Sequence, residues 1–371
     1  MDIFEELNIS RYINAHDTYT VYGGSRMTDE TIESMRMASA SFVDMQELQQ
    51  KLGCAAAKLT HNEAAYFTNG AAGGLTTAAA ICMAKGSEYR FARLPQIVPG
   101  TASEIIQIHC QHNAYDKAVE AAGARIIEIG DADETLEFDL EGVFSERTAA
   151  VFYYASMKYS QAALPLRDVI RIAHSHGIPV VVDAAAQLPP VENLWKFTDM
   201  GADMVIFSGG KTLCGPQDSG LIFGKMKYIE DCIRFGAPVH GVCRGCKTSR
   251  EAMAGLYSAL KQYVEMNHRE NAHRLDEIVK IFANSFRQCG VDTRIVPYGP
   301  VGQKYPRLFL SVKKQGAAQR IAKTMREKHI YVGLDLDQNA IYLSPLNLNE
   351  AEQKTVLHEL KAVVEEELCD M

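Results

Sequence analysis

The chain has 371 residues, 47% of them hydrophobic, which is enough to build one large and one smaller domain without disulfides or a structural metal. Its 38 Lys and Arg residues against 46 Asp and Glu residues give a net charge of −8 with no dense basic run, so we expect no nucleic-acid partner. No apolar stretch reaches the roughly 18 residues of a membrane span, and the N-terminus lacks a signal peptide, which predicts a cytoplasmic protein with no membrane contact.

Residues 1–40 are expected to form an N-terminal arm. The segment is rich in Tyr, Gly, Ser and Arg, and it is too polar to make a core of its own. Tyr19 and Arg26 belong to a polar cluster in this arm. We treat them as candidate substrate-binding residues, with exposed arm residues as the alternative.

A turn of small residues opens a helix at residues 68–74, with the sequence TNGAAGG. The free N–H groups and the dipole of such a helix start bind phosphate. Runs of Gly and Ala also occur where a helix simply packs closely on a sheet, so this segment alone leaves both interpretations open.

Short apolar runs alternate with amphipathic helices between about residues 55 and 225. Three of the runs have the composition of strands buried in a parallel sheet: AAVFYYAS (149–156), IPVVVDAA (178–185) and ADMVIFSG (202–209). A helix that starts near Pro165 and ends before Gly177 joins the first two runs. Strand, helix and strand in this order form a right-handed βαβ unit. We therefore expect a large α/β domain, residues 41–248, around a mainly parallel sheet.

Two ionisable residues follow these strands. Asp183 ends the second run and is either a helix cap or a functional acid. Lys211 follows the third run after Gly209 and Gly210, which allow the main chain to approach a ligand closely. A lysine in such a turn, taken alone, is more often a solvated loop residue. Because open α/β sheets bind ligands at the carboxyl ends of their strands, Lys211 is also a candidate nucleophile with a pKa lowered by desolvation.

The sequence Gly210-Lys211-Thr212 also resembles the end of a nucleotide-binding P-loop. That motif requires a Gly five residues before Gly210, and Val205 occupies this position within a strand. A P-loop nucleotide switch is therefore disfavoured.

Cys243 and Cys246 form a CxxC pair. The chain offers no second pair for zinc and no thioredoxin-like unit beginning there, so we expect neither a metal site nor a redox function. Arg244 lies between them and is suited to bidentate binding of a carboxylate or phosphate. Arg244 and Lys247 are therefore candidate substrate-binding residues.

Residues 249–371 are expected to form a smaller α+β domain. A long helical region runs from about Arg250 to Asn284, and short strands follow it. Two further helical segments are predicted at residues 317–328 and 350–368.

The small-residue turn, Asp183 and Lys211 occur in an order that suits pyridoxal 5′-phosphate (PLP). The turn would hold the phosphate, Asp183 would keep the pyridine nitrogen protonated, and Lys211 would form the Schiff base. Ala185 is small enough to lie under the flat ring. The sequence thus predicts carbanion chemistry on a small amino acid.

The chain resembles fold-type I PLP enzymes, in the branch of selenocysteine synthase and D-glucosaminate 6-phosphate ammonia-lyase. The resemblance covers most of the chain and is carried by LTHNEAAYFTNGAAG (59–73), VVVDAAAQLPP (180–190) and, most specifically, FSGGKTLCGPQDSGLIFGK (207–225). It implies the same roles for Lys211 and Asp183, and a homo-oligomer, at least a dimer, with active sites at the subunit interface.

The resemblance also implies further cofactor contacts. The phosphate would be held by Asn69, Gly70, Ala71 and Ala72 with help from Ser208. A residue of this family usually stacks on the exposed face of the ring, and of His109 and His112 we favour His112.

The chain departs from selenocysteine synthase in ways that argue against a tRNA substrate. That enzyme carries an extra N-terminal domain for its tRNA, whereas only about 60 residues precede the LTHNEAA segment here. The expected reaction is α,β-elimination with ammonia release from a small amino acid or a phosphorylated amino sugar acid. Racemisation and transamination share its first steps and stay open, as does a cofactor-binding module without catalysis.

Overall fold

The computed structural model describes residues 2–369, which divide into two compact units. Unit 1 combines residues 2–24 with residues 267–369, and unit 2 is Ser25–Met266. The division falls at other residues than the expected boundaries at 40/41 and 248/249. The reason is that α2 (Asp29–Ser39) and α11 (Arg250–Glu265) pack against each other within unit 2, while the start of the arm pairs with the C-terminal part.

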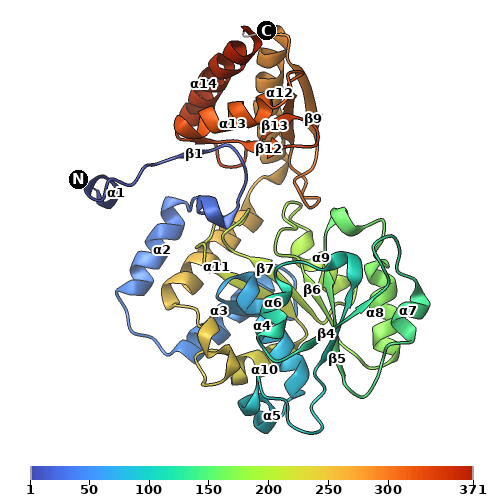
Figure 1. The fold of residues 1–371 in the computed structure, drawn as a ribbon. Helices are drawn as coiled ribbons and strands as arrows, with labels where there is room; N and C mark the ends of the chain where they lie inside the picture. The colour runs from blue at the N-terminus through green and yellow to red at the C-terminus, as the bar shows by residue number, and fades with distance from the viewer. Residues whose placement is uncertain (1, 370–371) are drawn as a thin grey trace. The chain divides into compact units, whose positions relative to one another are not determined.

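Unit 2 is built on a seven-stranded sheet with the order β2-β8-β7-β6-β5-β3-β4. Six strands run parallel, and β8 runs antiparallel to both of its neighbours. The mainly parallel α/β sheet expected from the sequence is therefore confirmed (Figure 1). The strands are β2 (Ala64–Thr68), β3 (Glu104–Ile108), β4 (Arg125–Ile129), β5 (Thr148–Tyr154), β6 (Val180–Asp183), β7 (Met204–Ser208) and β8 (Gly220–Gly224).

Two hydrophobic clusters cover the two faces of this sheet. Along β7, Val205 and Phe207 join one cluster, whereas Met204 and Ile206 join the other, as the two-residue period of a strand requires. On the first face lie α3 (Met45–Leu59), α7 (Glu137–Glu141), α8 (Leu166–Ser175), α9 (Asn193–Asp199) and α11. On the second lie α4 (Gly70–Ala84), α5 (Glu88–Arg93), α6 (Asp116–Glu120), α10 (Met226–Phe235) and the 3-10 helix η4 (Val242–Cys246).

The helix predicted between the strands of the βαβ unit is α8. Pro165 is its N-cap, its apolar residues are buried at the predicted spacing, and Gly177 follows it with a φ of 69°. Two further 3-10 turns follow strands of the sheet, η2 (His109–Gln111) after β3 and η3 (Met157–Tyr159) after β5.

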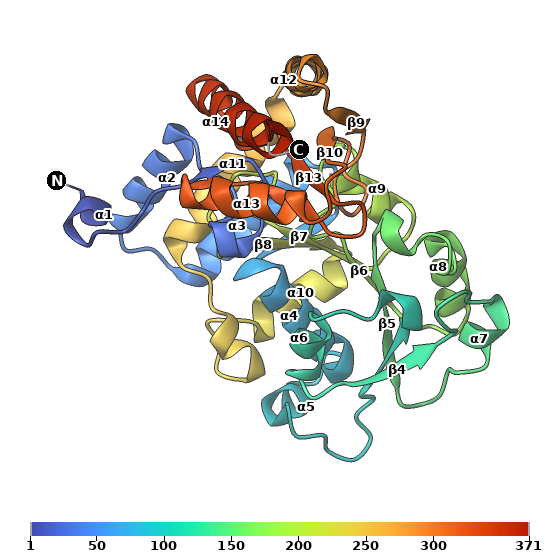
Figure 2. The ribbon, with the colours of Figure 1, turned by 45° about the horizontal axis from the view of Figure 1, so that its top comes forward.

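Unit 1 contains a four-stranded antiparallel sheet with the order β12-β13-β10-β9. Its strands are β9 (Asp292–Val296), β10 (Arg307–Ser311), β12 (Gly333–Asp335) and β13 (Ala340–Leu343). The helices α12 (His268–Gln288), α13 (Ala317–Glu327) and α14 (Glu350–Cys369) supply the core on one face of this sheet (Figure 2). The helical region expected from Arg250 to Asn284 is two helices, because α11 ends at Glu265 and Asn267 caps α12.

The start of the arm belongs to unit 1. It contains α1 (Ile3–Glu6), β1 (Ile13–Asn14) and the 3-10 turn η1 (Thr20–Tyr22), and β1 pairs in parallel with β11 (Ile330–Tyr331). Within residues 2–369, no helix combines the length and the apolar character needed to cross a membrane.

Candidate active site

The candidate residues of unit 2 follow strands that end at one edge of the sheet. Because β2, β3, β5, β6 and β7 are parallel, their carboxyl ends share this edge. The strand order reverses at β3, because β4 lies on one side of β3 and the next strand in the chain, β5, lies on its other side. Such a switch point is where open α/β sheets bind ligands. The residues that end or follow these strands are Asn69–Ala72 after β2, His112 after β3, Asp183 and Ala185 at β6, and Ser208 and Lys211 at β7.

The turn after β2 forms an open helix start. Asn69 is the N-cap of α4, but its side chain makes no capping hydrogen bond to the N–H groups of the first turn. Gly70 has a φ of 65°, and the hydroxyl of Thr68 donates to its carbonyl oxygen at 2.8 Å. A Cβ on Gly220 of β8 would lie 2.5 Å from the carbonyl carbon of Gly70. The turn is thus held tightly against the sheet, and a helix start that its own N-cap side chain does not cap is suited to an anion.

Asp183 ends β6 and is partly buried. Its Oδ1 accepts a hydrogen bond from the N–H of Ala185 at 2.9 Å. Burial raises the pKa of Asp183 above its ordinary value, and the Ala185 hydrogen bond and the charge of Lys211 oppose that rise. The charge of Lys211 therefore acts on the Asp183 carboxylate, as expected for an acid and a lysine that follow neighbouring strands.

Lys211 lies in the loop between β7 and β8, directly after Ser208, Gly209 and Gly210. A Cβ on Gly209 would lie 2.1 Å from Oγ of Ser219, and one on Gly210 would lie 2.5 Å from Oε1 of Gln217. Both glycines are therefore required by close packing within the loop, and they fix the main chain from which Lys211 projects.

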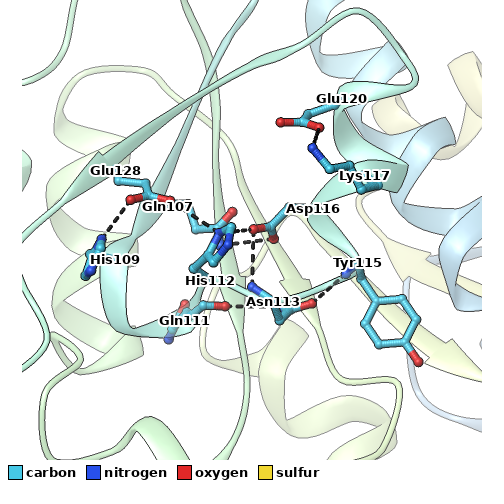
Figure 3. Close-up of polar contacts among 10 residues, drawn as sticks. All are labelled: Gln107, His109, Gln111, His112, Asn113, Tyr115, Asp116, Lys117, Glu120 and Glu128. Carbon is cyan, nitrogen blue, oxygen red and sulfur yellow. Dashed lines mark hydrogen bonds and ion pairs between the residues drawn. The ribbon is translucent and has the colours of Figure 1, made fainter.

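His112 is held by carboxylates (Figure 3). Its Nδ1 lies 2.6 Å from Oδ2 of Asp116 and 3.3 Å from Oε1 of Glu128, while 66% of its side chain stays exposed. Asp116 is buried and also accepts hydrogen bonds from Nε2 of Gln107 at 3.1 Å and from the N–H of Asn113 at 3.2 Å. Because these contacts use one edge nitrogen of the imidazole, they orient His112 and leave the faces of its ring available.

Arg244 and Lys247 lie on one side of the 3-10 helix η4, and Cys243 and Cys246 lie on the other. In a 3-10 helix, residues three apart share a face. Cys243 is buried and Cys246 half-buried against α4, and a Cβ on Gly73 would lie 3.4 Å from the Cβ of Cys246. Arg244 and Lys247 form the second row and are exposed. Burial raises the pKa of the Cys243 thiol to about 12, so it is not a reactive thiolate at neutral pH.

The arm residues divide between the units. Tyr19 belongs to unit 1, where its ring meets that of His16 edge-on with centroids 5.0 Å apart. Arg26 belongs to unit 2, is exposed, and directly follows Ser25, which contacts the main chain of Lys211.

Tyr154 was not identified from the sequence. It ends β5 and is the register partner of Asp183 on β6. Burial, followed by the charges of Asp183 and Asp116, raises its pKa, so the phenol stays protonated beside the carboxylate. Its position as the last residue of the run AAVFYY was the available signal, because the neighbouring strand ends in Asp183 in the same way.

These residues fit pyridoxal 5′-phosphate. An uncapped helix start suits a phosphate, a partly buried carboxylate suits a protonated ring nitrogen, and a lysine in a closely packed glycine loop suits covalent attachment. No group of three or more His, Cys, Asp or Glu side chains within residues 2–369 is arranged to hold a metal ion.

Comparison with known sequences gives relatives over most of the chain. It is 31% identical to D-glucosaminate-6-phosphate ammonia lyase of Salmonella typhimurium over 75% of this chain and 74% of that protein. It is 30% identical to 5′-C-glycyluridine monooxygenase-decarboxylase of a Streptomyces species, over 88% and 81%. L-seryl-tRNA(Sec) selenium transferase of Alkaliphilus metalliredigens matches at 28% identity over 44% of this chain and 36% of that protein. The resemblance found in the sequence is confirmed.

Comparison of structures agrees. A solved structure of D-glucosaminate-6-phosphate ammonia-lyase superposes with a TM-score of 0.84 at 27% identity and covers 99% of both chains. The family model for class-V aminotransferases matches residues 38–252, which include the glycine turn, Asp183, Lys211 and η4. The chain therefore belongs to the class-V aminotransferase family of PLP-dependent enzymes.

Proposed function

We propose that this enzyme releases ammonia from an α-amino acid by α,β-elimination. The observation that carries the proposal is that Asp183, Lys211 and the uncapped start of α4 all follow strands whose carboxyl ends lie at the same end of the sheet, with the charge of Lys211 acting on the Asp183 carboxylate. Similarity over most of the chain to an ammonia lyase, in sequence and in structure, supports this reaction.

Each residue has a distinct task in this proposal. Bound PLP supplies an electron sink for the carbanion that proton removal leaves on the substrate. Lys211 would attach the cofactor, and its amino group, when free, would take the proton from the α-carbon of the substrate. Asp183 would hold a proton on the ring nitrogen. The hydroxyl or substituted hydroxyl on the β-carbon then leaves, and the released enamine hydrolyses to a keto acid and ammonia.

The remaining residues hold the reactants. Asn69, Gly70, Ala71 and Ala72 would bind the phosphate of the cofactor through their N–H groups, with the hydroxyl of Ser208. Ala185 would lie under the ring, and His112 would lie over it, oriented by Asp116.

The proposed substrate is an amino acid with an anionic or sugar-like extension. The names of the two relatives reported above at 30% identity or more contain glucosaminate 6-phosphate and glycyluridine, each an amino acid joined to a sugar skeleton. Arg26, Arg244 and Lys247 of unit 2 are exposed cations suited to a carboxylate or phosphate, and Tyr19 stays a substrate-binding candidate from the sequence. The reaction is not expected to be tRNA-directed, because the chain carries a net charge of −8.

We also propose a homodimer with shared active sites. Cys243 and Cys246 occupy the side of η4 that faces α4. Arg244 and Lys247 therefore lie on the side of η4 away from α4. In a closed two-fold dimer such cations reach the partner's site reciprocally.

The test is a screen for ammonia release with D- and L-amino acids and phosphorylated amino sugar acids. Lys211→Ala serves as the inactive control, and borohydride reduction should attach the cofactor to the peptide that contains Lys211. Amino transfer to a keto acid without free ammonia, racemisation, or release of carbon dioxide would each replace elimination by another reaction. A colourless protein, or labelling of a different lysine, would contradict the proposed site.

A further inference from the structure

The loop that carries Lys211 is held from two sides. On the sheet side, the N–H of Gly209 donates to the carbonyl oxygen of Ser219 at 2.8 Å, and the N–H of Gly215 donates to that of Gly209 at 2.9 Å. These bonds close the base of the loop on β8. They do not reach the carbonyl groups of Gly210 and Lys211 themselves.

Those two carbonyl groups are bound by Ser25, which is 186 positions from Lys211 in the sequence. The Ser25 hydroxyl donates to the carbonyl oxygen of Lys211 at 2.6 Å and lies 3.1 Å from that of Gly210. The N–H of Ser25 donates to the carbonyl oxygen of Gly210 at 3.1 Å. Ser25 thus contacts both peptide groups that flank the α-carbon of Lys211.

The carbonyl oxygen of Lys211 accepts a second hydrogen bond. The N–H of Cys214 binds the same oxygen at 2.9 Å, so both of its lone pairs have donors. Cys214 adopts a φ of 56°, a left-handed conformation that is uncommon for a residue other than Gly. The loop therefore keeps a conformation that the local sequence alone would not favour, and Ser25 supplies one of the bonds that hold it.

Ser25 is itself anchored by the helix that follows it. Thr28 caps α2, and its hydroxyl lies 2.8 Å from Oε1 of Gln262 on α11. Further along α2, a Cβ on Gly255 of α11 would lie 2.7 Å from Cγ of Met35, so the two helices approach closely. The hydroxyl of Ser25 is consequently presented to the lysine loop from a packed pair of helices.

We propose that Ser25 is a positioning residue for Lys211. It fixes the main chain at the point from which the lysine side chain starts, and so sets where the amino group lies when it takes the α-proton. Ser25 has no part in attaching the cofactor. The inference rests on the proposed role of Lys211, and it extends that role to a residue of the N-terminal segment.

The test compares Ser25→Ala with Ser25→Thr, which keeps a hydroxyl. In Ser25→Ala we expect borohydride to label the Lys211 peptide as in the wild type, KM to change little, and kcat to fall about 10- to 100-fold, as misplacement of a reacting group predicts. The circular dichroism of the bound cofactor should weaken, because its orientation becomes less fixed. Ser25→Thr should recover most of both signals. Ser87→Ala is the matched control, since Ser87 caps the short helix α5 by accepting from the N–H of Arg90.

The outcomes separate this inference from the proposed function. Wild-type kcat and wild-type cofactor dichroism in Ser25→Ala, with Lys211 labelled in the wild type, would overturn the role of Ser25 alone. Labelling of another lysine in the wild-type protein would overturn the proposed site and this inference together. If Ser25→Ala does not fold, Ser25→Thr still decides: a folded Ser25→Thr with a labelled Lys211 and a lost kcat contradicts positioning through the hydroxyl.

Discussion

At the scale of single residues, the candidate site contains a carboxylate, that of Asp183, whose charged form is disfavoured by burial on folding. Burial raises the pKa of Asp183, so the folded apoprotein holds the carboxylate less readily than the unfolded chain does. The contribution of this group to stability is complete below its ordinary pKa of 3.8 and is lost as the pH rises through the raised pKa. At neutral pH Asp183 therefore destabilises the apoprotein, and a protonated ring nitrogen would offset that penalty.

Asp183→Asn should separate stability from activity. We expect the apoprotein of this variant to melt at a higher temperature than the wild type near neutral pH, because Asn carries no charge to desolvate. Activity should fall about 10²- to 10³-fold, as for the loss of a group that stabilises developing charge. The measurements are thermal melting of both apoproteins and steady-state kinetics of both holoenzymes.

The matched control for this variant is Asp199→Asn, at an exposed position at the end of α9. It should alter neither the melting temperature nor the rate. Full turnover by Asp183→Asn would remove Asp183 from the mechanism, and a lower apoprotein melting temperature would contradict the electrostatic penalty.

At the scale of elements, the turn after β2 (residues 69–72) depends on a strand that is far away in sequence. Gly220 starts β8, the strand antiparallel to both of its neighbours, and it lies against Gly70. Lys211 and Ser208 could be located from the sequence because they follow an apolar run. The packing of Gly220 on the turn could not, because the direction and the neighbours of β8 depend on long-range pairing and not on its own periodicity.

Gly220→Ala tests this packing. A Cβ at this position would lie 2.5 Å from the carbonyl carbon of Gly70, so the turn must shift away from the sheet. We expect cofactor affinity to fall about tenfold or more, measured by titration of the apoprotein with PLP. Gly142→Ala, at the end of α7, meets only the carbonyl oxygen of Phe138 at 3.2 Å and should bind PLP as the wild type does. Equal affinities in the two variants would show that the turn does not need this contact.

The opposite end of the same sheet, where its parallel strands begin, has a separate role in stability. Asp203 has a side chain that is 3% exposed and lies 2.8 Å from Nε2 of His174 and 2.7 Å from Nζ of Lys225. It also accepts a hydrogen bond from the N–H of Val180 at 2.8 Å. Asp203 thus joins α8, β6 and the end of β8 on the side away from the candidate active site.

Asp203→Ala should lower the free energy of unfolding by about 1–3 kcal/mol, because it leaves the buried N–H of Val180 without an acceptor. Asp168→Ala removes a surface carboxylate of α8 that lies 3.5 Å from Arg171, and it should change stability by less than about 0.5 kcal/mol. Urea unfolding of the apoproteins measures both. A folded Asp203→Ala enzyme should keep its kcat, and loss of kcat in it would show that the two edges are coupled.

At the scale of the whole molecule, the fold class and the parallel strands around the site followed from local patterns. The composition of each strand run and the Pro165-to-Gly177 helix were sufficient for that. The division into two units could not be predicted from local patterns, because it depends on pairings between distant segments. β1 pairs with β11 across more than 300 residues, and no periodicity within residues 1–40 indicates that partner.

Subunit mixing tests the proposed dimer. Lys211→Ala and Arg244→Ala are each expected to be inactive, the second because losing a bidentate charged contact costs about 2–5 kcal/mol in substrate binding. If Arg244 reaches the partner's site, a hybrid dimer contains one site with two changes and one wild-type site. With free exchange, half of the dimers are hybrids, so activity should return to roughly a quarter of the wild-type value.

The control for subunit mixing pairs Lys211→Ala with Asp183→Asn. Both residues belong to one sheet edge of the same chain, so this hybrid has a change in each site and stays inactive. Exchange is followed with differently tagged subunits. A mixture of Lys211→Ala and Arg244→Ala that exchanges and remains inactive assigns Arg244 to the site of its own subunit, and an active monomer contradicts the dimer itself.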